Sequence, residues 1–251
     1  FYISPKFLDL ERKAVFLNSW QPICRNDELS EVGSSVSGNE FGEPYGVIRL
    51  SESQLLAFSN VCRHHAACIL EGKGTTKELR CPYHGWTYSL EGDLKRIPGL
   101  GAVKNFDIKD FSLPRLKLEQ WGPLVFVNCR DDAPSLGMLA GGLKEELDRF
   151  GWSNLKFHVR RIYEIKCNWK VYVDNYLDGG YHVSVAHQDL ASDLNTQSYE
   201  TNTQPYYSIQ TCAAKESNKR LGKGAIYAFL YPNFMINRYG PMMDTNWVIP
   251  L

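Results

Sequence analysis

The sequence predicts an α+β protein in which a short helix and a small β domain precede a second domain of mixed helices and strands. Three features indicate this: helical spacing near the start, short β-rich runs broken by Gly and Pro over residues 21–128, and a later helical stripe followed by further strands. A chain of 251 residues is long enough for two modest domains with buried cores. Its 43% hydrophobic and 22% charged residues exclude a disordered chain or a coiled coil.

The first element is predicted to be a helix within residues 1–20 that packs on the second domain. Ser4 and Pro5 form a good N-cap and first-turn pair, and apolar residues follow at helical spacing up to Trp20. Residues 21–130 then form the β domain. Its expected strands are residues 45–50, 55–61, 86–90, 116–118 and 124–127.

The second domain is predicted over residues 131–251, after a linker at residues 131–135. A helical stripe covers residues 136–150, and apolar alternation suggests strands within residues 155–165. Asn168 to about Leu190 reads as a helix interrupted by two glycines. Further strands are expected at residues 225–231, 234–239 and 243–249. Because the chain stops inside a strand pattern, we expect this domain to be truncated at its C-terminal end.

The net charge and the cysteine content limit the expected binding partners and the expected cellular compartment of the protein. Lys plus Arg and Asp plus Glu number 28 each, so no net basic field is available to hold nucleic acid or an anionic membrane. No run approaches the ~20 apolar residues that span a bilayer. The seven cysteines are odd in number and scattered. We therefore expect a soluble protein of a reducing compartment, cytoplasmic or, in a plant, the chloroplast stroma.

The strongest motif pairs one cysteine with one histidine in each of two segments. Cys62 and His64 are followed after sixteen residues by Cys81 and His84. Two thiolates and two neutral imidazoles are the ligands of a Rieske [2Fe–2S] centre. A zinc site uses the same ligand types, but zinc modules usually open with two close cysteines and end with a histidine pair. The neighbouring His65 is interpreted as a bystander.

Glycines within and between the two cysteine segments are candidates for close backbone approach to the cluster. Gly85 and Gly74 lack a Cβ atom and leave room for hydrogen bonds to sulfide.

A second histidine pair suggests another iron. His182 and His187 are separated by four residues, which places them ~140° apart on a regular helix. They converge on one ion only if the helix loosens, which Gly179-Gly180 makes plausible. Two imidazoles and a carboxylate leave open positions on Fe(II) for O2 and substrate. Taken alone, the pair is also compatible with two satisfied core histidines.

Together these motifs resemble the Rieske non-heme iron oxygenases. The cluster motif matches in full, and the later stretch is similar to the family signature through Asn168-Trp169-Lys170, Asp174-Asn175-Tyr176 and Tyr181-His182. The resemblance implies a small antiparallel Rieske β domain and a catalytic domain of antiparallel sheet packed with helices. Respiratory Rieske proteins carry a disulfide at places that here hold Ala67 and Tyr83. The oxygenase or ferredoxin type is therefore favoured.

The resemblance also implies roles for acidic residues. An acid shortly before the first iron histidine is expected to bridge electrons from the cluster of a neighbouring subunit, and Asp178 is the candidate, with Asp174 as the fallback. The third iron ligand is an acid much later in the family, so we expect it beyond Leu251. The acids that receive no assignment are Asp189, Asp193 and Asp244.

The amino-acid sequences of residues 63–67, 174–183 and 239–246 are particularly similar to those of choline monooxygenase-like members of the family. That similarity implies hydroxylation of choline to betaine aldehyde hydrate, a step of betaine biosynthesis, using O2 and electrons from a ferredoxin or a flavin reductase. A homotrimer is implied, because the bridge needs a neighbour. The alternatives are an oxygenase or demethylase of another small organic substrate, a non-catalytic Rieske electron carrier and a zinc-stabilised binding module. Tyr231, Phe234, Tyr239 and Trp247 are aromatic candidates for the pocket wall, without an assigned cage.

Overall fold

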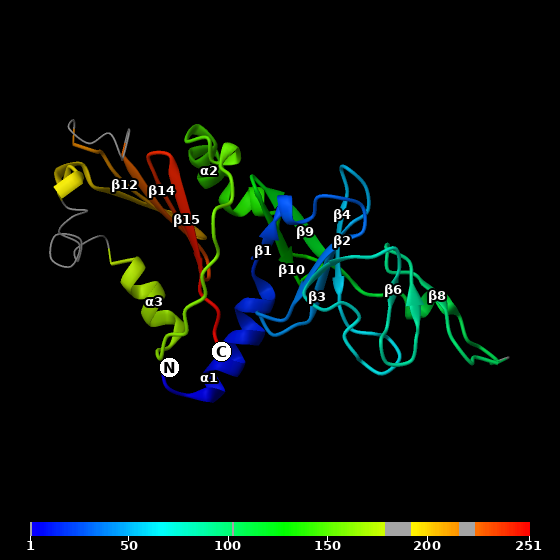
Figure 1. The fold of residues 1–251 in the computed structure, drawn as a ribbon. Helices are drawn as coiled ribbons and strands as arrows, with labels where there is room; N and C mark the ends of the chain where they lie inside the picture. The colour runs from blue at the N-terminus through cyan, green and yellow to red at the C-terminus, as the bar shows by residue number, and fades with distance from the viewer. Residues whose placement is uncertain (1, 102, 179–191, 216–223) are drawn as a thin grey trace. The chain divides into compact units, whose positions relative to one another are not determined.

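The computed structural model describes residues 2–101, 103–178, 192–215 and 224–251. The chain divides into two compact units, Arg12–Ala133 and Phe1–Glu11 with Pro134–Leu251 (Figure 1). The first contains antiparallel sheets, and the second an antiparallel sheet with helices. The predicted α+β class is therefore confirmed.

Local capping sets the starts of two of the helices. The α-helices that the structure describes in full are α1 (Pro5–Ala14), α2 (Leu136–Arg149) and α3 (Trp169–Tyr176). Ser135 caps α2 by accepting a hydrogen bond from the Met138 backbone N–H. Asn168 caps α3 in the same way, through the backbone N–H of Lys170. These polar caps satisfy N–H groups that a helix leaves free at its start.

The β unit contains a seven-stranded sheet in the order β1-β10-β9-β4-β3-β2-β5 and a three-stranded sheet in the order β6-β7-β8. Every pair in both sheets is antiparallel. The strands are β1 (Gln21–Arg25), β2 (Ser34–Gly38), β3 (Tyr45–Arg49), β4 (Leu55–Ser59), β5 (Lys73–Thr75), β6 (Leu79–Arg80), β7 (Thr87–Tyr88), β8 (Leu94–Arg96), β9 (Arg115–Trp121) and β10 (Leu124–Asn128). One apolar cluster joins the two sheets and includes Phe58, Leu79 and Tyr88.

The second unit is built on a five-stranded sheet in the order β11-β12-β13-β14-β15. Its strands are β11 (Glu200–Thr203), β12 (Tyr207–Cys212), β13 (Ala225–Leu230), β14 (Phe234–Tyr239) and β15 (Met242–Trp247). On one face, Phe229 and Met235 pack against α3 through Val173. On the other face, the Arg238 guanidinium donates to the carbonyl of Phe150 at the end of α2. The sheet therefore separates α2 from α3.

The N-terminal helix is shorter than the apolar spacing predicts. It ends at Ala14, and a 3-10 turn occupies Phe16–Asn18. The Asn18 side-chain amide donates to the carbonyls of Lys13 and Ala14 at 2.8 and 3.1 Å. Because the amide satisfies carbonyls that another helical turn would have used, the helix stops there.

The predicted strands within residues 155–165 are wrong, because this stretch has neither helix nor strand. Most of its apolar side chains are exposed, and its backbone joins none of the sheets that the structure describes; alternation alone does not make a strand. Strands β11 and β12 lie where the sequence analysis expects none. Beyond Tyr176, the interrupted helix expected to about Leu190 lies mostly outside the described residues.

The helices among the described residues are all too short or too polar to cross a membrane.

Candidate metal centre

The first cysteine loop follows β4 and is closed by backbone hydrogen bonds. The Cys62 N–H donates to the Ala67 carbonyl at 2.9 Å, and the Ala66 N–H donates to the Cys62 carbonyl at 3.0 Å. Ala66 has a φ of 58°, which is rare for a residue with a side chain. Such strained backbone persists only where the surrounding structure imposes it, and it is concentrated at functional sites.

The second cysteine loop joins β6 to β7 and repeats the same pattern. The Cys81 N–H donates to the Trp86 carbonyl at 2.8 Å, and the Gly85 N–H donates to the Cys81 carbonyl at 3.1 Å. Gly85 has a φ of 73° and stands four residues after its cysteine, as Ala66 does. Gly74, in contrast, lies in β5. The two loops are thus built alike.

Both cysteine side chains are buried beneath their loops. Cys62 is 2% exposed, Cys81 is 3% exposed, and both belong to the apolar cluster of the β unit. The Tyr88 hydroxyl lies 3.3 Å from the Cys62 Sγ atom and accepts a hydrogen bond from the Arg63 N–H. Burial and then the contact with Cys62 raise the pKa of Tyr88 well above its usual value, and the charge of Cys81 adds to this. The Cys62 thiol therefore has a buried hydroxyl as its polar neighbour.

The imidazoles lie on the exposed side of the same loops. The rings of His64 and His84 are 4.8 Å apart, and His64 stacks on Trp86 with ring centroids also 4.8 Å apart. Desolvation and the neighbouring imidazoles lower the pKa of His64, which favours the neutral form that a metal ligand needs. His65, interpreted above as a bystander, lies 4.0 Å from His64 and 5.3 Å from His84, ring to ring.

The arrangement of the donors fits two iron atoms better than one zinc ion. Among the described residues, the ligand atoms of His64, His65 and His84 lie within 4.8 Å of one another, and neither thiol joins that group. The donors of a single zinc ion, at bond lengths of about 2.0–2.3 Å, would lie within about 4 Å of one another. Buried thiols on one side and exposed imidazoles on the other match the division of ligands in a Rieske cluster.

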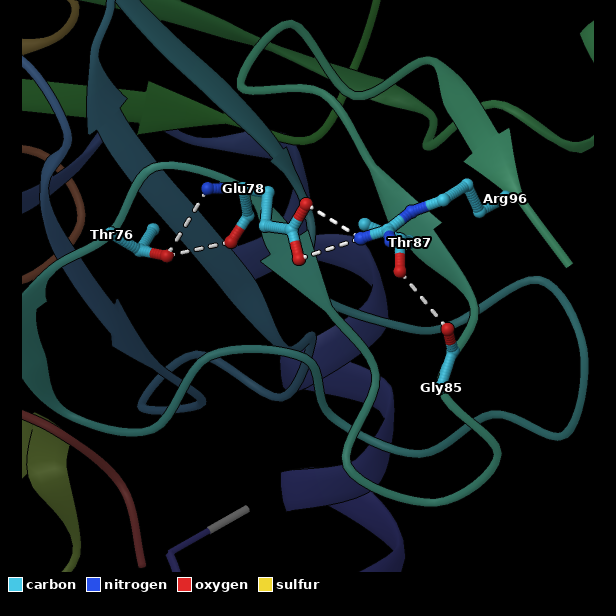
Figure 2. A network of polar contacts seen from close by, with 5 residues as sticks. All are labelled: Thr76, Glu78, Gly85, Thr87 and Arg96. Atoms are coloured by element: carbon cyan, nitrogen blue, oxygen red, sulfur yellow. Dashed lines mark hydrogen bonds and ion pairs between the residues drawn. The ribbon is translucent and has the colours of Figure 1, made fainter. Parts of the chain in front are cut away.

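A polar network braces the sheet that carries the second loop (Figure 2). The Thr87 hydroxyl donates to the Gly85 carbonyl at 3.0 Å, and Thr87 is paired with Arg96 across β7 and β8. Figure 2 shows the Arg96 guanidinium pointing at Glu78, whose two carboxylate oxygens it contacts at 2.9 and 2.8 Å. Because both side chains are exposed, this ion pair contributes mainly orientation.

The predicted ligands of the second iron, His182 and His187, lie outside the described residues. Asp178 follows α3 and is half-buried. Burial raises the pKa of Tyr199 to about 12, with smaller contributions from Cys212 and from the charge of Asp178. Asp178 thus lies two residues beyond the last residue of α3, Tyr176.

Two of the other acids, Asp174 and Asp244, accept hydrogen bonds within the fold. Asp174 accepts a hydrogen bond of 2.6 Å from the Tyr2 hydroxyl. Asp244, on β15, accepts one from the Asn237 amide at 2.7 Å and another from the Tyr239 hydroxyl. Asp193 lies just before an isolated bridge, and Asp189 falls outside the described residues.

Sequence reasoning missed Tyr88 and a row of polar residues across the five-stranded sheet. Tyr88 is fully buried in a two-residue strand, and no motif marked it. Of the aromatic candidates, Phe234 is buried and Tyr231 is 41% exposed.

Comparison with known families divides the chain into the same two kinds of domain. Residues 19–107 match the Rieske [2Fe-2S] domain, and residues 152–251 match the ring hydroxylating alpha subunit catalytic domain. The two matches imply an iron–sulfur cluster in the first domain and a mononuclear iron in the second.

Individual relatives agree with these matches. Choline monooxygenase of Arabidopsis thaliana is 38% identical over the whole of this chain and 63% of its own length. The carnitine monooxygenase oxygenase subunit of Acinetobacter baumannii is 32% identical over 87% of this chain and 60% of its own. The chain thus spans about three fifths of the length of these relatives.

A crystal structure of a quaternary ammonium Rieske monooxygenase superposes with a TM-score of 0.83 at 30% identity, covering 95% of this chain and 67% of its own. A second, with L-carnitine bound, gives 0.83 at 29% identity over 97% and 68%. With both family matches and a relative of this identity and coverage, the chain belongs to the Rieske non-heme iron oxygenases, as an alpha subunit chain in which the Rieske domain precedes the catalytic domain.

Proposed function

We propose that the protein is a Rieske monooxygenase that hydroxylates a small quaternary ammonium substrate, choline, to betaine aldehyde hydrate. The observation that carries the proposal is the pair of matched loops, with two buried thiols on one side and two exposed imidazoles on the other. In a site of this kind the cluster supplies single electrons, and the mononuclear iron supplies open positions for O2.

Each part of the chain has a role in this proposal. Cys62 and Cys81 hold the inner iron of the cluster, and His64 and His84 hold the outer iron. Tyr88 donates its hydroxyl hydrogen to the Cys62 sulfur, because a cysteine that holds iron is a thiolate and has no hydrogen to donate. The exposed imidazoles place the outer iron at the surface, where electrons can enter and leave.

In this proposal the second unit holds the mononuclear iron at which the substrate reacts. His182 and His187 bind the mononuclear iron, and Asp178 bridges it to the cluster of a neighbouring subunit in a homotrimer. A ferredoxin or a flavin reductase supplies the electrons, in a reducing compartment that keeps the cysteines free. Asp174 is a weaker bridge candidate, since its carboxylate already accepts the Tyr2 hydroxyl.

Two alternatives to choline hydroxylation are considered: another quaternary ammonium substrate, and electron transfer without catalysis. Carnitine is the second candidate substrate, because carnitine monooxygenase oxygenase subunits are among the relatives. A non-catalytic electron carrier would need only the first unit, and the match of residues 152–251 to a catalytic domain speaks against it.

The cluster assignment is tested by iron and acid-labile sulfide analysis of anaerobically purified protein. We expect Cys62→Ser and Cys81→Ser to lose both, since only ligands couple metal binding to local folding. The matched control is Cys68→Ser, which removes an exposed thiol from the first loop. Zinc without sulfide in the unaltered protein would contradict the assignment.

The substrate assignment is tested by turnover. The full-length protein is supplied with a reductase, NADH and O2, and product formation is compared for choline, L-carnitine and an uncharged aromatic compound. We expect product with choline. Product with carnitine alone would select the second candidate, and product with the aromatic compound alone would reject a quaternary ammonium substrate.

A further inference from the structure

A continuous polar row crosses the second unit's sheet on the face that holds α3. The register aligns Gln210 with Tyr227, Tyr227 with Asn237, and Asn237 with Asp244. These four residues are called the polar row below; on β13 and β14, Phe229 and Met235 flank it on one side and Ala225 and Tyr239 on the other. Gln210 is buried, Tyr227 and Asn237 are half-buried and Asp244 is exposed, so the polar atoms of the first three need hydrogen-bond partners.

Most of the row is joined by hydrogen bonds. Gln210 is 2% exposed, donates to the Tyr176 carbonyl at 3.3 Å and accepts the Tyr199 hydroxyl. The Tyr176 hydroxyl donates to the Asn237 side chain at 2.8 Å, and the Asn237 amide donates to Asp244. These contacts fix the row against the end of α3.

One member of the polar row, Tyr227, has a hydroxyl that makes no hydrogen bond with the described residues. The Tyr227 Oη atom is buried and has no hydrogen-bond partner among the described residues. Burial raises the pKa of Tyr227 to about 12, with smaller contributions that include the charge of Asp244. The hydroxyl therefore keeps its proton at neutral pH, and an unsatisfied buried hydroxyl is costly unless a ligand or water completes it.

The charged side chain that strands β11–β15 present on the α3 side of the sheet is acidic. In strands β11–β15, which the structure describes in full, Asp244 is the one acidic or basic side chain on the α3 side of the sheet. Its charge also contributes to raising the pKa values of Tyr172 and Tyr176, after burial in each case. Lys170, on α3, already binds Glu11 at 2.5 Å and lies over the ring of Tyr2.

We propose that the polar row is the wall that selects the substrate, with Asp244 attracting its quaternary ammonium group and Tyr227 binding its hydroxyl. A quaternary ammonium has no hydrogen to donate, so a carboxylate and the faces of tyrosine rings are what hold it. Tyr239, whose hydroxyl donates to the carboxylate of Asp244, supplies such a ring beside it. Tyr227 and Asp244 are two strands, about 10 Å, apart at their Cα atoms, with Asn237 between them.

This assignment rests on the proposed function and sharpens it. Choline carries one positive charge and one hydroxyl, and both find a partner on the row. L-carnitine adds a carboxylate, which Asp244 repels and for which this face of the sheet offers no cation. The polar row therefore favours a cationic amino alcohol over the zwitterion.

The test measures equilibrium binding of choline, tetramethylammonium and L-carnitine to the iron-loaded protein by calorimetry. We expect Asp244→Asn to weaken both cations about three- to tenfold, because an exposed ion pair contributes up to about 1 kcal/mol and a tenfold change is about 1.4 kcal/mol. Carnitine binding should be unchanged or stronger. Asp244→Glu, which keeps the charge, should restore part of the cation binding. The matched control is Glu200→Gln, which removes an exposed carboxylate from the opposite face of the sheet.

Tyr227→Phe separates the hydroxyl from the charge. It should weaken choline about three- to tenfold and leave tetramethylammonium, which has no hydroxyl, unchanged. If Asp244→Asn lowered the affinity for all three ligands equally, or for none of them, the role of the polar row in selectivity would be wrong, and the proposed function would be unaffected. If the unaltered protein bound no quaternary ammonium compound, both the role of the polar row and the proposed function would be wrong.

Discussion

The environment of the cluster cysteines is set by one buried residue that no motif contains. Tyr88 contacts the Cys62 sulfur at 3.3 Å, and its oxygen is already an acceptor for the Arg63 N–H. When Cys62 holds iron it is a thiolate without a hydrogen, so the tyrosine hydroxyl is the donor in this contact. A hydrogen bond to sulfur is stronger when the cluster is reduced, since the reduced cluster carries more negative charge.

Tyr88→Phe should lower the reduction potential of the cluster. A difference of about 1 kcal/mol between the two oxidation states corresponds to about 40 mV for one electron, so we expect a drop of that order. A spectroelectrochemical titration measures it. Tyr83→Phe is the control, because that tyrosine is 65% exposed and its hydroxyl contacts no cysteine. An unchanged potential in Tyr88→Phe would show that the hydroxyl does not donate to sulfur.

Asp178→Asn should affect product formation without affecting reduction of the cluster. The change keeps the shape of the side chain but removes its charge, so cluster reduction should persist while product formation falls about 10- to 100-fold. Stopped-flow reduction and product analysis on one preparation measure the two. Asp174→Asn is the comparison, since that acid bonds to Tyr2. Full turnover would reject the bridge, and loss of bound iron would make Asp178 a ligand instead.

At the scale of elements, α3 is held at both ends. The N-terminal segment holds its start: Glu11 accepts hydrogen bonds from the Trp169 indole at 2.9 Å and from Lys170 at 2.5 Å. The sheet holds its end, where the Tyr176 hydroxyl bonds to the carbonyl of Ala228 at 3.1 Å. Because the chain that carries His182 follows α3 directly, these anchors determine where that chain begins.

Glu11→Gln should loosen the first anchor in a pH-dependent way. Burial works to raise the pKa of Glu11, but the hydrogen bonds from Lys170 and Trp169 outweigh it, so its pKa lies below the usual value. A carboxyl with a lowered folded pKa stabilises at pH values above its unfolded pKa, and that stability is lost as the pH falls through the folded pKa.

The free energy of unfolding, measured in urea at pH 7, should therefore be about 1–2 kcal/mol lower in Glu11→Gln than in the unaltered protein. The gap should close at pH values below the carboxyl range. Glu145→Gln, at an exposed position of α2, provides the baseline for loss of a carboxylate. A gap that does not depend on pH would mean that packing and not charge forms the anchor.

At the scale of the whole molecule, two units supply two separate metal centres. The β unit contains every donor proposed for the cluster, and these donors lie together in the structure. The second unit carries the histidines proposed for the mononuclear iron, and the third ligand is proposed to lie beyond Leu251. The two centres should therefore differ in how well this chain binds them.

Titration of Fe(II) into the 251-residue chain should show a full cluster and weak binding of the additional iron. Two neutral imidazoles leave the double positive charge of the ion uncompensated. Mössbauer spectroscopy or iron analysis after desalting counts the bound ions. Asp244→Ala is the paired variant, because both oxygens of Asp244 are already acceptors for Asn237 and Tyr239. Tight binding of one extra iron that disappears in Asp244→Ala would show that Asp244 closes the site.

The sequence alone determined what depends on short-range chemistry. Cys62, His64, Cys81 and His84 are recognisable because each loop must carry its two ligands within four residues. Ser135 and Asn168 mark helix starts because a cap acts on the next two or three residues. The α+β class and the strands β13, β14 and β15 followed from the periods of local patterns.

Only the tertiary structure decided what depends on pairing between distant segments. Residues 155–165 have the alternation of a strand but join none of the described sheets, whereas the polar strand β11 exists because β12 lies beside it. Tyr88 comes to Cys62 across 26 residues, and the polar row joins four strands in one register. Neither is visible in a local pattern, because hydrogen bonds and charges act through space between residues that the fold alone brings together.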